Sequence, residues 1–281
     1  MANIPVKDAT GSTVYLKSDG LGTDPSPFAP VQNVFIQDQT TAGISLYLGQ
    51  TLDAGVTFRT NQALDDTTVD ITTTGTTPVV GDNILIVEGE KFAQEEITAV
   101  TPIAGNDYDV DVSMPLDYAF TTAATITLQN IDMNVNGSVT PVEFGISPTG
   151  ALAGIEWDIN RMLVIMTHTG AGDDGLFGDQ AQLTNGVYFR LEDGGTFNLF
   201  NARDNSDFAS EGYDLAYSTR SGGGGAFGTR SRITFNGRDK RGIVLRLAAD
   251  TDDKFVGVVR DNLAALSHFH VKVQGQVVDP N

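Results

Sequence analysis

The sequence predicts an all-β protein whose sandwich-like or barrel-like main body carries a small inserted β-barrel-like unit and an extended N-terminal arm. Three observations lead to this prediction. Short runs of β-branched and aromatic residues recur along the chain, and Gly, Asp or Asn closes most of them. Helical patterns are confined to two short segments, 201–208 and 261–266. Among the 281 residues, 15 Phe and 7 Tyr supply bulky side chains for a sizeable core.

The N-terminal arm is predicted over residues 1–30. Residues 14–16 (Val-Tyr-Leu) have the composition of one short strand. Two glycines and three prolines then interrupt regular structure, at positions 20, 22, 25, 27 and 30. Such a segment buries too little apolar surface to fold alone, so we expect it to dock on the body or on a neighbouring subunit.

The main β domain is predicted over residues 31–78 and 132–281. Its strands are expected at 35–36, 44–48, 56–58, 157–166, 187–191, 197–200, 232–235, 243–247 and 269–277. The Thr-rich stretch 65–80, which contains Pro78, is assigned no strand.

The small inserted β domain is predicted over residues 79–131. A strand at 81–87, a tight turn and a returning strand at 92–100 open the unit, and strands at 108–112 and 124–128 extend it as a meander. This number of short strands in about 50 residues is typical of a small barrel.

The charge of −19 is divided unevenly along the chain. Residues 1–160 carry 4 Lys/Arg and 21 Asp/Glu, a net of −17, whereas residues 161–281 carry 13 and 15, a net of −2. The acidic first half will repel nucleic acid and anionic membranes. This division indicates a surface that meets other proteins, or one that lines a channel to which DNA must not bind.

A basic stretch at 220–246 is the exception to this acidity, with Asp239 as its single acidic residue. We predict a subunit interface there, at Arg220, Arg230, Arg232, Arg238, Lys240 and Arg241. These cations would contact the acidic first half of a neighbouring copy, an arrangement that favours ring assembly. Sequence-specific nucleic-acid binding is not expected, because phosphate contacts need a favourable net field.

The metal-site candidates are weak. Asp107, Asp109 and Asp111 alternate on one predicted strand, so their carboxylates share a face and offer oxygen ligands to a hard cation. The alternative, which we favour, is an acidic strip that keeps an edge strand soluble. The groups Asp204/Asp207 and Asp250/Asp252/Asp253 are weaker still, since neither has the loop pattern of an EF-hand.

The chain has three histidines. His268 and His270 lie two apart on a predicted strand and could bind one metal, but no third His and no Cys lies nearby in the sequence. We therefore favour a solvated or interface pair. His168 with Asp173 or Asp174 could be imagined in a catalytic triad, but the sequence has no nucleophile elbow. No catalytic residue, cofactor or metal is assigned, and no enzyme activity is expected.

Composition also limits the cellular setting. The absence of Cys excludes disulfides, thiolate catalysis and Cys-ligated zinc. The N-terminus has neither the basic region nor the apolar run of a signal peptide, and no apolar run reaches the roughly 18–20 residues of a membrane helix. We expect folding in a reducing cytoplasm and no membrane insertion.

Several stretches resemble the virion structural proteins of tailed bacteriophages. Residues 1–25 resemble the start of many such proteins, and the stretches 183–190, 237–247, 261–263 and 269–275 are similar to phage structural proteins. The resemblance covers about half the chain and brings no catalytic motif. It implies a β-rich virion component that is assembled in the host cytoplasm from copies of itself and other virion proteins.

Three functions follow as expectations. The first is a non-enzymatic structural subunit of the tail or head–tail region, where an acidic lumen would let DNA slide without binding. The second is a capsid decoration (cement) protein, whose arm would reach across capsomers. The third is a receptor- or glycan-binding module that stacks sugars on exposed aromatic residues such as Trp157 or Tyr213.

Overall fold

A computed structural model describes residues 4–7, 13–16, 43–211, 214–219, 227–234 and 245–278. Its regular structure is almost entirely β, which confirms the predicted fold class. The chain divides into two units, Met1–Ala42 and Gly43–Asn281. In the part of the chain that the structure describes, no helix is both long and apolar enough to cross a membrane.

The first unit contains a two-stranded antiparallel hairpin. Strand β1 (Ile4–Lys7) pairs with β2 (Thr13–Leu16), so that Ile4 lies opposite Leu16. The sequence predicted only the second of these strands. Pro5 weakens the strand signal of β1, because proline cannot donate to a β-ladder.

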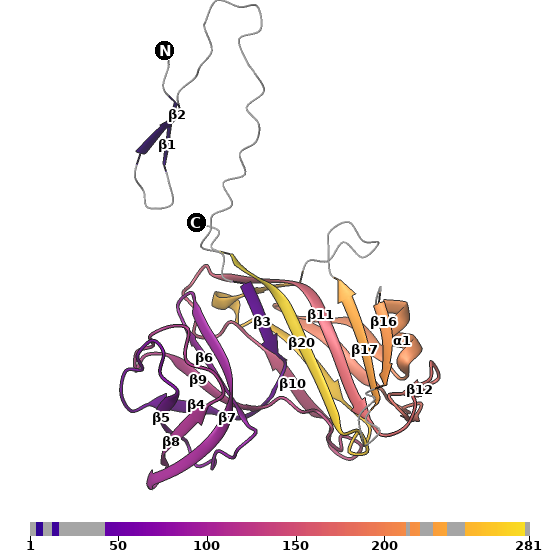
Figure 1. Cartoon of the computed structure of the whole chain (residues 1–281). Coiled ribbons are helices and arrows are strands. Elements are labelled where there is room, and N and C mark those ends of the chain that lie inside the picture. The colour runs from indigo at the N-terminus through magenta and orange to yellow at the C-terminus, as the bar shows by residue number, and fades with distance from the viewer. Residues whose placement is uncertain are drawn as a thin grey trace, which may run out of the picture. The chain divides into compact units, whose positions relative to one another are not determined.

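The closed barrel of the second unit has the strand order β4-β5-β8-β7-β6-β9 (Figure 1). Its strands are β4 (Gln50–Phe58), β5 (Thr68–Thr72), β6 (Asn83–Glu88), β7 (Lys91–Ala104), β8 (Asp107–Val112) and β9 (Thr125–Asn130). The sequence predicts that this unit begins at residue 79 and that residues 50–78 belong to the main domain. The structure places β4 and β5 in the barrel instead, because β4 pairs with both β9 and β5 and thereby closes it.

The barrel interior is filled by inward-facing residues from all six strands, which alternate along each strand with outward-facing ones. On β5, Val69 and Ile71 are fully buried, and on the neighbouring β8 Val110 is fully buried as well. Leu116 and Phe120, in the segment between β8 and β9, complete the core. The Thr-rich stretch 65–80 thus contains strand β5. Its two apolar residues, Val69 and Ile71, are two positions apart and therefore both face the core.

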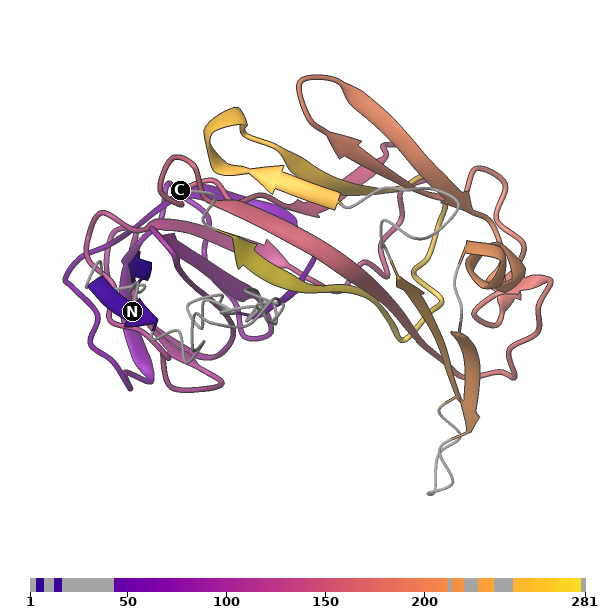
Figure 2. The same ribbon diagram turned by 90° about the horizontal axis from the view of Figure 1, so that it is seen from above.

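The remainder of the second unit consists of two sheets. The six-stranded sheet has the order β16-β17-β11-β20-β3 with β18 also paired to β11, and the four-stranded sheet has the order β10-β19-β14-β15. Figure 2 shows them as separate layers. Their strands are β3 (Gly43–Tyr47), β10 (Val142–Ile146), β11 (Glu156–His168), β14 (Val187–Glu192), β15 (Thr196–Ala202), β16 (Asp214–Thr219), β17 (Phe227–Thr234), β18 (Leu245–Ala248), β19 (Lys254–Val259) and β20 (His268–Val278).

We call the two sheets together the sandwich. Aromatic side chains fill the space between them. Phe144 on β10 and Phe269 on β20 meet edge to face with ring centroids 6.3 Å apart. Gly257 on β19 makes room for the Phe144 ring, since a Cβ there would lie 2.2 Å from it. The remaining elements are short: the hairpin of β12 (Leu176–Phe177) and β13 (Gln180–Ala181), helix α1 (Asn205–Glu211) and a 3₁₀ turn η1 (Ala249–Thr251). The segment 261–266, predicted as helical, forms turns instead.

The barrel is attached to the sandwich at strand β3, which forms an edge of the six-stranded sheet. The side-chain amide of Gln94, on barrel strand β7, accepts a hydrogen bond from the Tyr47 N–H (2.6 Å) and donates one to the Tyr47 carbonyl (2.9 Å). It also donates to Gln129 Oε1 on β9 (3.0 Å). We call this arrangement the Gln94 clamp. It satisfies backbone groups that an edge strand would otherwise leave unpaired.

Two further contacts support the same junction. Gly49 and Gly145 exchange backbone hydrogen bonds of 3.2 and 2.9 Å. Phe92 of the barrel packs against the buried Trp157 of β11, with ring centroids 5.6 Å apart. The barrel is therefore inserted between β3 and β10 and packs on the sandwich.

Candidate functional site

The predicted subunit interface is only partly within the described residues. Arg220, Arg238, Lys240 and Arg241 lie outside them. Arg230 and Arg232 are exposed on β17, and they alternate with the buried Thr229 and Ser231. Both arginines therefore lie on the outer face of the six-stranded sheet, where a neighbouring subunit would have access. The interface itself stays a prediction.

Arg246, at the end of the same basic stretch, has partners within the chain. Its guanidinium makes a bidentate contact with Asp158 (2.8 and 3.1 Å) and lies 3.0 Å from Glu156. The Asp158 hydrogen bond raises the pKa of Arg246, which therefore stays charged. Half of its side chain is exposed, but its charge is already balanced.

Acidic side chains dominate the barrel. Residues 50–130 contain 13 Asp/Glu and 2 Lys/Arg, a net of −11. Both cations are ion-paired to barrel carboxylates, Arg59 to Asp109 and Lys91 to Glu88. The barrel thus presents a predominantly negative surface, and we call it the acidic barrel.

Asp107, Asp109 and Asp111 share one face of β8, as the sequence predicted. Each carboxylate is engaged by a protein group. Thr72 Oγ1 donates to Asp107 and Thr68 Oγ1 to Asp111, both at 2.6 Å, while Arg59 pairs with Asp109. These partners belong to the polar outer face of the barrel. The arrangement favours an acidic strip over a cation site. The strip does not protect an edge strand, contrary to the prediction from the sequence, because β8 pairs with both β5 and β7 in the closed barrel.

His168 is buried, and both of its ring nitrogens are engaged in the sandwich interior. Nδ1 lies 2.8 Å from the Gly170 carbonyl, and Nε2 lies 2.9 Å from Thr229 Oγ1. A carbonyl oxygen only accepts, so Nδ1 carries the proton. In a catalytic triad Nδ1 would face a carboxylate, so this contact argues against the triad imagined from the sequence.

The aromatic residues considered for sugar stacking do not form a described binding face. Trp157 is 1% exposed and packs in the core, so it offers no stacking surface. Tyr213 lies outside the described residues.

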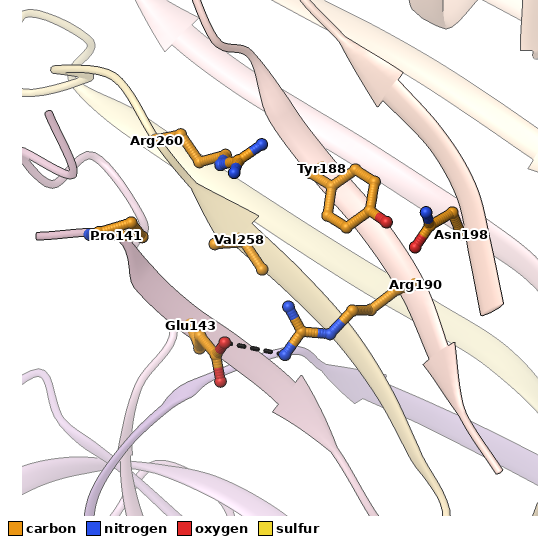
Figure 3. A pocket seen from close by; sticks show the side chains of 7 residues that line it. All are labelled: Pro141, Glu143, Tyr188, Arg190, Asn198, Val258 and Arg260. Carbon is orange, nitrogen blue, oxygen red and sulfur yellow. Dashed lines mark hydrogen bonds and ion pairs between the residues drawn. The ribbon is translucent and has the colours of Figure 1, made fainter. Parts of the chain in front are cut away.

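A shallow groove crosses the outer face of the four-stranded sheet (Figure 3). It is lined by Pro141, Glu143, Tyr188, Arg190, Asn198, Val258 and Arg260. Arg190 bridges Glu143 (2.8 Å) and Glu192 (2.7 Å), and Arg260 lies over the Tyr188 ring. A ligand would have to displace the ion pairs of Arg190, so we assign the groove no ligand.

The structure brings Asp132 to the His268/His270 pair. Asp132 follows barrel strand β9 by two residues, whereas the histidines open strand β20 of the sandwich. Asp132 Oδ2 lies 2.6 Å from His268 Nδ1 and 3.8 Å from His270 Nε2. Within the described ranges, these three side chains form the one group of His, Asp or Glu that is close enough together to hold a metal ion, with its ligand atoms within 4.8 Å of one another. We call it the Asp132 triad.

The sequence identified two members of the triad but missed the third. His268 and His270 share a face of β20 because side chains repeat every two residues on a strand, and their ring centroids are 5.4 Å apart. Asp132 is 136 residues away in the sequence. Nothing in the local pattern shows that the chain leaving the barrel passes beside β20.

Burial sets the protonation of the half-buried His270. Its pKa is lowered by desolvation, which outweighs the attraction of Asp132. The ring is therefore neutral at pH 7 and has a lone pair to offer.

No family model, curated protein or solved structure matches this chain.

Proposed function

We propose that this chain is a non-enzymatic structural subunit of a tailed-bacteriophage virion. Its place would be the tail or head–tail region, and it would assemble in the host cytoplasm with copies of itself and other virion proteins. The observation that carries the proposal is the division of charge over the fold. The acidic barrel has a net charge of −11, whereas residues 131–281 carry 13 Lys/Arg and 19 Asp/Glu, a net of −6.

This division supports head-to-tail assembly. The acidic barrel has no unpaired cation, and Arg230 and Arg232 are exposed on the outer face of the sandwich. Contact between these two surfaces in successive copies would lower the repulsion that a chain of −19 otherwise feels toward itself. Because the two surfaces differ, the interface is heterologous and leads to a ring or a filament.

The acidic barrel also supports a position along the DNA path. Phosphate contacts by Lys and Arg supply most of the non-specific affinity of proteins for DNA. A channel lined by acidic barrels lacks that attraction, so DNA would pass without being trapped.

Cross-linking tests the proposed interface, because the chain has no natural Cys. One preparation carries Arg230→Cys and the other carries Asp111→Cys, an exposed position on the acidic barrel. After mixing, a short thiol cross-linker should join the two variants into a dimer. The matched control pairs Arg230→Cys with Asp250→Cys, an exposed acidic residue outside the barrel. Equal cross-linking in both mixtures, or none in the first, would contradict head-to-tail contact.

Capsid decoration is the second candidate. It is favoured by the separate N-terminal unit Met1–Ala42, which is small enough to act as an anchoring arm. Decoration requires the full chain to bind preformed, expanded capsids. Co-sedimentation of the purified chain with such capsids would favour this role over a tail position.

A further inference from the structure

We infer that the Asp132 triad binds a divalent transition-metal ion, with zinc as the best fit. The ligands would be one imidazole nitrogen from each of His268 and His270 and a carboxylate oxygen of Asp132, and these ligand atoms already lie within 4.8 Å of one another. The ion would fasten the chain leaving the barrel to strand β20 of the sandwich.

The geometry suits such an ion after small side-chain adjustments. Three ligands about 2.1 Å from a tetrahedral zinc ion lie roughly 3.4 Å from one another. Asp132 Oδ2 lies 2.6 Å from His268 Nδ1 and 3.8 Å from His270 Nε2, and these two distances fall on either side of this value.

The carboxylate is held in a binding orientation by the backbone. Asp132 Oδ1 accepts a hydrogen bond from the Phe269 N–H at 2.9 Å, so Oδ2 is left to face both imidazoles. The Met133 N–H also donates to the Phe269 carbonyl at 2.8 Å. Hydrogen bonds that orient a ligand in this way are typical of metal sites. Here they fix Asp132 between two histidines of a single strand.

The donor set decides the class of metal. Two imidazole nitrogens and one carboxylate oxygen suit zinc and other late first-row divalent ions. Calcium and magnesium prefer oxygen ligands throughout and would bind poorly. His268 is 55% exposed, so solvent can supply the remaining ligand.

The position of the site gives the metal a structural role. Asp132 belongs to the connection between β9 and β10, while the histidines begin β20. A shared ion would therefore cross-link segments that are 136 residues apart. Because only the folded chain brings these ligands together, metal binding would stabilise the fold.

Metal titration of the full-length protein tests the inference. The protein is first treated with a chelator and dialysed, and Zn²⁺ or Ca²⁺ is then titrated by calorimetry. We expect uptake of one Zn²⁺ per chain, no comparable uptake of Ca²⁺, and a rise in melting temperature with Zn²⁺. Co²⁺ in place of Zn²⁺ should give the visible absorption of a nitrogen- and oxygen-ligated ion.

Three variants identify the ligands. His268→Ala, His270→Ala and Asp132→Asn should each weaken Zn²⁺ binding by more than the roughly 10–100-fold loss that removal of an outer-shell partner causes. Asp132→Asn keeps an oxygen that can accept from Phe269, and His268 is largely exposed, so both variants should fold. Asp111→Asn, which removes an exposed carboxylate elsewhere, is the matched control and should leave the affinity unchanged.

Two results would overturn the inference. The first is failure of the wild-type protein to take up Zn²⁺. The second is uptake that survives in folded His268→Ala and Asp132→Asn, with circular dichroism as the check of folding.

Discussion

Replacing Gln94 with Ala is expected to weaken the junction between the barrel and the sandwich. The substitution removes the whole Gln94 clamp: the hydrogen bond from the Tyr47 N–H, the bond to the Tyr47 carbonyl and the bond to Gln129 Oε1. Gln129 is buried, so water cannot readily replace its lost partner. Tyr47 is half-buried, so water can replace part of what its backbone loses.

The expected loss follows from these three bonds. At about 1 kcal/mol of net stabilisation for each hydrogen bond, the free energy of unfolding should fall by about 2–3 kcal/mol. Urea unfolding followed by circular dichroism measures this change. Gln94→Glu should be destabilising as well, because a carboxylate keeps an acceptor for the Tyr47 N–H but cannot donate to the Tyr47 carbonyl or to Gln129.

Thr101→Ala is the matched control, since Thr101 is an exposed residue of the same strand β7. Its effect should stay within about 0.5 kcal/mol. A Gln94→Ala protein that unfolds at the same urea concentration as the Thr101→Ala protein would refute the reasoning that the clamp holds the junction.

Two further stability predictions rest on other parts of the second unit. Burial raises the pKa of Asp53, but hydrogen bonds from Gly55 and Thr74 more than offset this and leave it below the ordinary value. The ionised Asp53 therefore stabilises the fold above pH about 4, which is the pKa of the group in the unfolded chain. This stabilisation is lost as the pH falls through the lower pKa that Asp53 has in the folded protein. Urea unfolding should show Asp53→Asn to be destabilising at pH 7, with a smaller gap from wild type at pH 3; an unchanged gap would contradict this. In the same assay, Gly257→Ala should lower the free energy of unfolding by about 1–3 kcal/mol, because the added Cβ would overlap the Phe144 ring. Gly195→Ala, with its nearest atom 3.9 Å away, is the control, and equal effects of the two substitutions would contradict the packing argument.

Much of the fold could be predicted from the sequence because its signals are local. The apolar run near Trp157 becomes the central strand β11, and the run at 269–277 becomes β20. Strand β11 has buried apolar residues at every second position on either side of a register shift between Ile159 and Arg161, and β20 has them at 269, 271 and 273, which is the period that a half-buried strand requires.

The barrel boundary was missed because its first strands have weak local patterns. Strand β4 contains the buried Asp53, and its pairing with β9 shifts register on either side of that residue. Such irregular pairing breaks the alternation of polar and apolar residues. Strand β5 is short, and its Thr-rich surroundings are typical of a loop.

The Asp132 triad shows the same limit for a site. The spacing of His268 and His270 places both rings on one face of a strand, and this could be inferred from sequence. The approach of Asp132 depends on how the chain returns from the barrel to the sandwich. That path is a property of the tertiary fold and leaves no mark within a few residues of Asp132.

The mass of the assembled protein in solution tests the central claim most directly, namely that this chain works by packing on copies of itself through charge. Sedimentation velocity of the full-length protein should show one closed oligomer of fixed copy number at low salt. That oligomer should dissociate as salt is added or when Arg230 and Arg232 are both replaced by Glu, because screening and charge reversal each remove the attraction. A species with the mass of a single chain at every salt concentration, with or without the two substitutions, would contradict the account.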